Sequence, residues 1–225
     1  GITNISIDLI YGLPGQTLEE WESNLEEAIR LQIPHISAYH LIYEEGTALY
    51  KLLEAGKITP VEEELSVTLF STLIDRLTEA GYLHYEISNF ARPGCFSQHN
   101  SSYWTGKPYL GIGPSAHSYN GHSRQWNVSS LPLYIKGINE QSPEIEIEEL
   151  DIHTRYNDFI ITSLRTMWGI RLNDIRTLFG EDKLSYLNQQ AKSYLQKGLL
   201  LQQHDTLTLS KEGIFISDGI MSDLL

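Results

Sequence analysis

The chain of 225 residues is poor in cysteine, with Cys95 as its single thiol. One cysteine rules out an internal disulfide framework and is typical of proteins that work in a reducing cytoplasm. It also excludes an iron–sulfur cluster held by three or four thiolates of this chain. We therefore expect a cytoplasmic protein without structural disulfides.

Long apolar runs are also missing. None approaches the ~18 residues that cross a bilayer, so no transmembrane segment is expected. Basic residues are scarce, with 16 Lys and Arg against 29 Asp and Glu and a net charge of -13. The acidic surplus lies almost wholly in residues 1–150, and the rest is nearly neutral. Neither part has the basic surface of a non-specific nucleic-acid binder, so no nucleic-acid partner is expected.

The first part of the chain alternates strand and helix patterns. Residues 5–11 form an apolar run interrupted by Asp8, which is typical of a buried strand. Thr17 and Glu20 then form a capping box that opens an amphipathic helix. Further segments predicted in the same way are a strand in HISAYHLIY, helices over about 47–55 and 60–80 (the second capped by Thr59), and a strand in HYEISNFA. This order predicts an α/β layer with a parallel sheet, either open or curved into a barrel.

The tail changes character after the acidic loop SPEIEIEELD. Three helical patterns, a β-hairpin and a last helix follow; the helices are predicted at about 151–168, 171–179 and 183–197, and the hairpin turns at His204-Asp205. Three helices and a hairpin predict a winged-helix-like module. We expect the domains to be 1–130 and 131–225. Near-neutral charge favours a protein contact or a lid for the tail over a DNA reader.

Asp8 is the first candidate for chemistry. A carboxylate within an apolar strand is costly to bury unless it is paired or hydrogen-bonded. In parallel α/β folds, ligands lie at the carboxyl ends of the strands. Asp8 therefore either accepts hydrogen bonds from a nucleotide-like ligand or bridges strand ends, and its local sequence favours neither interpretation.

The second candidate is a cluster of His99, Asn100, Tyr103 and Trp104 in QHNSSYWTGKPYLGIGPSAHSY. Imidazole is a frequent axial ligand of haem iron, flat aromatic rings pack on a porphyrin, and an asparagine can orient a ligating histidine. By spacing alone, a turn beside an aromatic core is favoured over a ligand site. Cys95 and His99 form a Cys-x-x-x-His pair, which falls short of the four ligands of a structural zinc site.

Five segments, taken in order, resemble the oxygen-independent coproporphyrinogen III oxidase-like family of radical S-adenosylmethionine (SAM) proteins. They are DLIYGLPGQT, ISAYHLIYEEGT, SNFARPG, QHNSSYW and YLGIGPSAHSY. The tail is similar to the C-terminal domain of that family, so the resemblance covers essentially the whole chain. The H-N-x-x-Y-W signature at His99 to Trp104 resembles the haem chaperone branch of the family.

The resemblance implies a fold class and a set of ligands. The fold is α/β, the C-terminal half of a partial (β/α)6 radical SAM barrel followed by a small helical, winged-helix-like domain. Asp8 matches a SAM-contacting aspartate, and Ile42 and His117 fall near further SAM-contacting positions. His99, Asn100, Tyr103 and Trp104 match the haem-binding motif, with His99 as the ligand of the haem iron.

One departure from the family bears on activity. The family binds a 4Fe-4S cluster through C-x-x-x-C-x-x-C, whereas Cys95 matches none of those positions. We expect a fragment that lacks the cluster-binding half and cannot cleave SAM by itself, with the cluster ligands outside this chain.

Two functions follow from the resemblance. The leading hypothesis is a haem chaperone that binds haem and transfers it to acceptor haemoproteins, at the membrane face; a homodimer is left open. The alternative is an oxygen-independent coproporphyrinogen III oxidase (dehydrogenase) of porphyrin biosynthesis, which would make the intact protein an enzyme.

Overall fold

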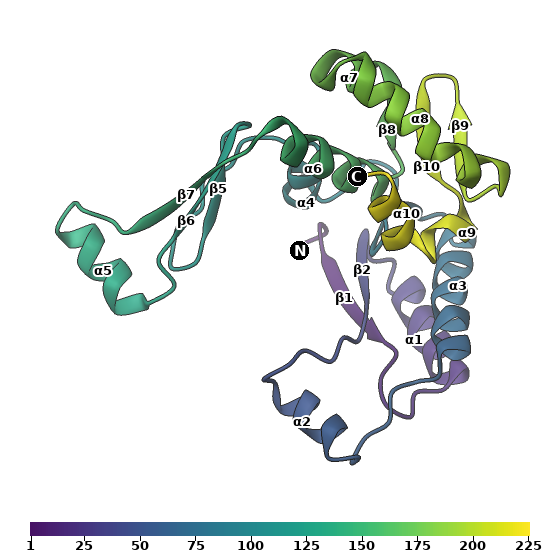
Figure 1. The fold of residues 1–225 in the computed structure, drawn as a ribbon. Coiled ribbons are helices and arrows are strands. Elements are labelled where there is room, and N and C mark those ends of the chain that lie inside the picture. Colours follow the sequence, from purple (N-terminus) through teal and green to yellow (C-terminus); the bar gives the residue numbers. More distant parts are fainter. The chain divides into compact units, whose positions relative to one another are not determined.

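The computed structural model describes residues 1–225 and contains two compact units, Gly1–Ser97 and Gln98–Leu225 (Figure 1). The division by contacts falls upstream of the domain boundary predicted at 130/131. That boundary concerns where the C-terminal module begins, and it stays a prediction.

The first unit is an α/β layer. Its elements are β1 (Ser6–Tyr11), α1 (Leu18–Arg30), β2 (His35–His40), α2 (Ala48–Glu54), α3 (Glu63–Glu79), β3 (Leu83–Glu86) and β4 (Asn89–Ala91). The four strands form one sheet in the order β1-β2-β4-β3. β1 and β2 are parallel, whereas β4 is antiparallel to both of its neighbours.

HYEISNFA was expected to be a single strand of a parallel sheet, and that prediction was wrong. The backbone N–H of Ser88 donates to the Glu86 carboxylate, and a turn at residues 87–88 divides the segment into β3 and β4. Because the chain reverses there, β4 runs antiparallel to β2. Only the β1–β2 pair is parallel.

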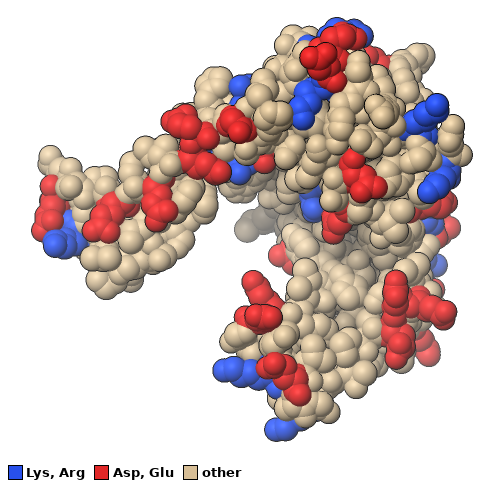
Figure 2. Space-filling view, in the orientation of Figure 1, with Lys and Arg blue, Asp and Glu red and all other residues tan.

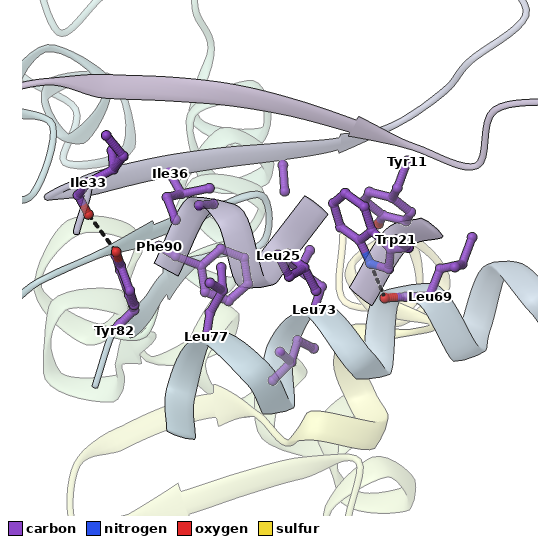
Figure 3. Packing of buried hydrophobic residues seen from close by; sticks show 13 residues of the cluster. Tyr11, Trp21, Leu25, Ile33, Ile36, Leu69, Leu73, Leu77, Tyr82 and Phe90 are labelled. Atoms are coloured by element: carbon purple, nitrogen blue, oxygen red, sulfur yellow. Dashed lines mark hydrogen bonds between the residues drawn. The ribbon is translucent and has the colours of Figure 1, made fainter. Parts of the chain in front are cut away.

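Helix α1 begins as the capping box predicts. The N–H of Glu20 donates to the Thr17 hydroxyl, and the N–H of Thr17 donates to the Glu20 carboxylate. Its apolar stripe buries Trp21, Leu25 and Ala28, and the Trp21 indole N–H donates to the carbonyl of Leu69 on α3 over 3.0 Å (Figure 3). The core of the first unit therefore lies between one face of the sheet and the two long helices.

The expected cap at Thr59 is wrong, since α3 starts three residues later than predicted, with Glu62 at its N-cap and no side-chain cap. Residues 59–62 have no regular structure. Glu63 and Glu64 instead place negative charge in the first turn, where the helix dipole favours it.

The second unit has two sheets. Its elements are α4 (Gln98–Trp104), β5 (His117–Tyr119), β6 (Ser123–Asn127), α5 (Leu131–Asn139), β7 (Ile145–Glu149), α6 (Ile152–Leu164), β8 (Ile170–Arg171), α7 (Leu172–Phe179), α8 (Glu181–Gln196), β9 (Leu200–Gln203), β10 (Thr206–Leu209), α9 (Lys211–Ile214) and α10 (Ser217–Asp223). Strands β5-β6-β7 form an antiparallel sheet, and β8-β10-β9 form another.

Two segments of this unit differ from the expectation. The acidic stretch expected to be a loop contains β7, because its alternating Ile and Glu residues suit a strand, and it pairs with β6. Figure 2 shows acidic side chains along the segment that contains β7. The exposed Glu144, Glu146, Glu148 and Glu149 belong to this segment. The segment favoured as a turn, Gln98–Trp104, is a short helix.

The three helices and the hairpin predicted for the tail are confirmed, whereas the predicted last helix is divided into α9 and α10. Helices α6, α7 and α8 enclose a second core with the β8-β10-β9 sheet, and the β9–β10 hairpin turns at His204 and Asp205. Tyr156 is fully buried in this core, and its hydroxyl donates to the carbonyl of Leu224 over 3.0 Å. That bond ties the C-terminal helix to α6. No helix of the chain is both long and apolar enough to cross a membrane.

Candidate functional site

Helix α4 exposes the candidate iron ligand. His99 is exposed near its start, and Nε2 of its ring lies 3.2 Å from the hydroxyl oxygen of Tyr103, one helical turn later. The two rings meet edge to face, with centroids 5.0 Å apart. The polar side chain that orients the His99 ring is therefore Tyr103, and Asn100 is half-buried beside it. Nδ1 of the His99 ring makes no hydrogen bond within the protein.

Trp104 is the last residue of α4, and its indole nitrogen is buried without a hydrogen-bond partner. The guanidinium of Arg165, at the end of α6, lies over the Trp104 ring at 5.0 Å from its centroid. The indole N–H of Trp104 is buried and has no hydrogen-bond acceptor in the protein, and the same holds for the hydroxyl of Ser101. Buried polar groups are nearly always satisfied, so these two atoms are exceptions in the packing around α4.

An aromatic series continues from α4. The rings of Tyr103 and Tyr109 meet edge to face with centroids 4.8 Å apart, and Tyr109 is followed by Tyr119 of β5 at 6.0 Å. Burial raises the pKa of Tyr109 above the ordinary value for a tyrosine. These side chains form one wall of a cavity.

The cavity has a volume of about 540 Å³ and is lined by α4, β5, β6, α6 and the β8–α7 segment. Arg124 of β6 forms an ion pair with Asp158 of α6, and both side chains are about one-third exposed. The hydrogen bond to Asp158 raises the pKa of the Arg124 guanidinium. The lining also contains Arg155 and Arg171, which make no ion pair. All of these residues belong to the second unit.

This cavity was not predicted from the sequence. Its charged residues come from segments far apart in the chain, and none forms a recognisable motif. The available signal was the spacing of Arg155, Asp158, Phe159, Thr162 and Ser163, which places them on one face of α6.

The candidate SAM contacts Asp8 and Ile42 lie in the first unit. Asp8 is exposed on β1, opposite Ser37 of β2 in the strand register. Ile42 follows the end of β2 and is 79% exposed. The Asp8 carboxylate makes no hydrogen bond within the protein and is free to accept one from a ligand hydroxyl, which fits a nucleoside.

Beside Asp8 the same face of the sheet holds buried polar side chains that the sequence analysis did not single out. Ser37 donates to the side-chain oxygen of Asn89 over 3.0 Å, and the Asn89 amide donates to the Glu86 carboxylate. Glu86 is only 2% exposed. The sequence did contain a signal for this buried group: Glu86 interrupts the apolar pattern of HYEISNFA, just as Asp8 interrupts the apolar run of residues 5–11.

A second chain of hydrogen bonds runs through His35, to which the sequence analysis assigned no role. Its Nδ1 lies 2.7 Å from the Ser6 hydroxyl, and its Nε2 lies 2.8 Å from the Tyr85 hydroxyl. Burial lowers the pKa of His35, and the Asp8 carboxylate partly offsets this. Burial also raises the pKa of Tyr85 to about 12. Both groups are therefore neutral near pH 7 and orient one another.

His117 lies on β5 in the second unit, where its ring stacks on Trp126 with centroids 5.5 Å apart. It is exposed and free to contact a ligand. Cys95 is half-buried in the first unit. No three His, Cys, Asp or Glu side chains of the chain are grouped to hold a metal ion, so its residues do not fit a 4Fe-4S cluster.

Three comparisons with known proteins agree with one another. A family model described as the HemN C-terminal domain matches residues 150–216. The chain is 30% identical over 226 residues to a protein named Heme chaperone HemW from Bacillus subtilis (strain 168), covering 100% of this chain and 60% of that relative. It is 42% identical over 236 residues to radical S-adenosyl methionine domain-containing protein 1, mitochondrial, of Danio rerio, covering 98% of this chain and 52% of the relative.

The fold agrees with a solved structure described as "Coproporphyrinogen III oxidase (HemN) from Escherichia coli is a Radical SAM enzyme". The TM-score is 0.76 at 21% sequence identity, over 100% of this chain and 55% of that chain. This likeness confirms the expected α/β fold class. The chain spans about 60% of the Bacillus subtilis relative and less of the other two proteins.

Proposed function

Because this chain belongs to the HemN- and HemW-like family of radical SAM proteins, we propose that it binds haem and transfers it to haemoproteins. Proteins named heme chaperone HemW match the chain along its entire length. These relatives are longer than the chain, so the function is proposed for the intact protein to which these residues correspond.

The observation that carries the proposal is the His99–Tyr103 pair on α4. His99 is exposed, its ring is oriented by the Tyr103 hydroxyl, and one ring nitrogen is left without a protein partner. Neutral imidazole with one nitrogen hydrogen-bonded and the other free is the usual state of a metal-ligating histidine. In this proposal His99 ligates the haem iron, Tyr103 holds its ring, and Asn100 and Trp104 contribute to the same site.

SAM is the second ligand in the proposal. Asp8 accepts hydrogen bonds from the nucleoside, and Ile42 and His117 are further candidate SAM contacts. SAM and a 4Fe-4S cluster supply radical chemistry when bound together, but the cluster ligands lie outside this chain. The part of these residues is to bind and orient SAM.

The protein works in the cytoplasm and gives haem to acceptor haemoproteins at the membrane face. Whether two copies associate is left open.

The alternative function is oxygen-independent coproporphyrinogen III oxidation, and the fold likeness to the HemN structure favours it. An enzyme of that kind converts propionate side chains of coproporphyrinogen, whereas a chaperone leaves its cargo unchanged. Incubation of the intact protein and its reconstituted cluster with coproporphyrinogen III separates the two. Decarboxylated product supports the oxidase, and recovery of unchanged tetrapyrrole with haem binding supports the chaperone.

The haem proposal is tested by an absorption titration with haem. Wild type is compared with His99→Ala and with His122→Ala, which removes another exposed histidine whose side chain makes no hydrogen bond. We expect weaker binding and an altered haem spectrum for His99→Ala only. Equal affinity and equal spectra for all three proteins contradict the proposal.

A further inference from the structure

The cavity of the second unit has features that haem ligation by His99 does not use. Its volume of about 540 Å³ lies within the range of small-molecule sites, roughly 300–1,000 Å³. Aromatic rings form much of its wall: Tyr103, Trp104, Tyr109, Tyr119, Phe159 and Trp168. Flat π-faces of this kind suit a planar conjugated ligand.

The charges of the cavity favour an anion. Its lining contains Arg124, Arg155 and Arg171 together with Asp158 and Asp174. Arg124 is neutralised by its ion pair with Asp158. Arg155 and Arg171 remain without an ion pair, against Asp174 alone. A positive surplus is uncommon in a chain whose net charge is -13.

We propose that this cavity holds the porphyrin ring of the cargo and that Arg155 and Arg171 bind its two propionate carboxylates. This inference rests on the proposed haem function and extends it. Guanidinium groups bind carboxylates through paired, charge-assisted hydrogen bonds, and the aromatic wall packs on the ring.

The cavity borders the predicted iron ligand. Tyr103 lines the cavity and also orients His99, which itself is not part of the lining. Helix α4 therefore presents the iron ligand at the edge of the cavity, and α6 and the β8–α7 segment supply the carboxylate-binding groups. Ring recognition and iron ligation are thus assigned to different side chains and can be tested separately.

The test uses iron-free protoporphyrin IX, whose fluorescence reports binding without an iron ligand. Affinities are measured for wild type, Arg155→Gln, Arg171→Gln and the double variant. Lys192→Gln, at an exposed site on α8, is the charge-matched control. Circular dichroism verifies that each variant is folded. The dimethyl ester of protoporphyrin IX provides the matching change in the ligand.

We expect each arginine variant to weaken protoporphyrin binding roughly tenfold to a hundredfold, as loss of one charge-assisted hydrogen-bonded contact implies. The Lys192→Gln control binds like wild type. The dimethyl ester binds weakly, and the double variant does not weaken it further. Equal binding of protoporphyrin by wild type and the double variant overturns the inference, and so does equal binding of the acid and its ester by wild type.

The His99→Ala variant separates this inference from the proposed function. If His99→Ala alters only the haem spectrum while the arginine variants weaken the binding of iron-free porphyrin, the iron-ligand assignment and the cavity inference both hold. If His99→Ala leaves the haem spectrum unchanged but the arginine variants act, the cavity holds and the ligand assignment fails. If only His99→Ala acts, the ligand assignment holds and the cavity inference fails. Absence of any porphyrin binding overturns both.

Discussion

The hydroxyl oxygen of Tyr103 lies 3.2 Å from Nε2 of His99 on the exposed side of helix α4. This contact makes His99 an oriented imidazole. It also connects the histidine to the aromatic cavity, because Tyr103 belongs to the cavity wall. Iron ligation and ring binding therefore share one residue, and Tyr103 is the first position at which the account can be tested.

Replacing Tyr103 with phenylalanine keeps the ring and removes the hydrogen bond to His99. Loss of such an orienting partner typically weakens metal binding by about 10- to 100-fold. We expect haem affinity to fall within that range while iron-free porphyrin binds nearly as before. Tyr50→Phe, on α2 of the first unit, serves as the control. Equal losses for haem and iron-free porphyrin would show that the Tyr103 hydroxyl contributes to ring binding and not to the orientation of His99.

Stability of the first unit should fall with acidity because of His84. Its ring stacks on Phe90 with centroids 4.3 Å apart, and burial lowers its pKa, partly offset by the carbonyl of Ile87 and by Glu86. The unfolded chain then binds more protons than the folded one below about pH 6.5. Stability is therefore complete above that pH and decreases as the pH falls toward the lower pKa of the folded state.

The His84→Gln variant tests this titration, because glutamine can still donate to the carbonyl of Ile87. Urea midpoints are measured between about pH 7.5 and pH 5. We expect a shallower loss of stability on acidification than in wild type, with the remainder due to His35, whose pKa is also lowered by burial. The exposed His122→Gln control should follow the wild-type curve. An unchanged slope for His84→Gln would refute the assignment.

Trp21 should dominate the core between α1 and α3. It is 1% exposed, and its indole N–H donates to the Leu69 carbonyl. Trp21→Ala should lower the free energy of unfolding by about 3–5 kcal/mol, as other large truncations in cores do. Asn24→Ala, exposed on the same helix, should change it by no more than about 0.5 kcal/mol. Similar urea midpoints for the two variants would contradict the packing described in Figure 3.

Two glycines of the second unit should respond oppositely to alanine. Gly169 has a φ of +62°, and an added Cβ would lie 2.3 Å from the carbonyl oxygen of Leu207, so Gly169→Ala should destabilise the unit by more than about 1 kcal/mol. Gly219, in α10, has open space around it, so Gly219→Ala should stabilise it by roughly 0.5–1 kcal/mol. Thermal unfolding of both variants checks the sign, and a stabilised Gly169→Ala would contradict the structure.

Elements with local causes were predictable from the sequence. The Thr17–Glu20 capping box and the β9–β10 hairpin occur where the pattern placed them, because caps and turns depend on residues a few positions apart. The start of α3 was misplaced: the T-P pattern at Thr59 predicted a helix from residue 60, whereas the helix begins at Glu63. Division of HYEISNFA into two strands depends on side-chain bonds around Glu86, which periodicity does not encode.

The candidate site was predictable only in part. His99 and Tyr103 were singled out by a local signature, and their hydrogen bond follows from four-residue spacing on a helix. The cavity could not be foreseen, because Arg155 and Arg171 meet the aromatic residues only through packing of α6 and the β8–α7 segment. Long-range packing leaves no periodic trace in the sequence.

The most direct test of the account is the ligation state of the haem iron. Resonance Raman and electron paramagnetic resonance spectra are recorded for the haem complexes of wild type and His99→Ala, with and without added imidazole. The account predicts a histidine-ligated spectrum for wild type, its loss in His99→Ala, and its recovery when free imidazole fills the vacated position. A His99→Ala complex that retains the wild-type histidine-ligated spectrum without imidazole would contradict it.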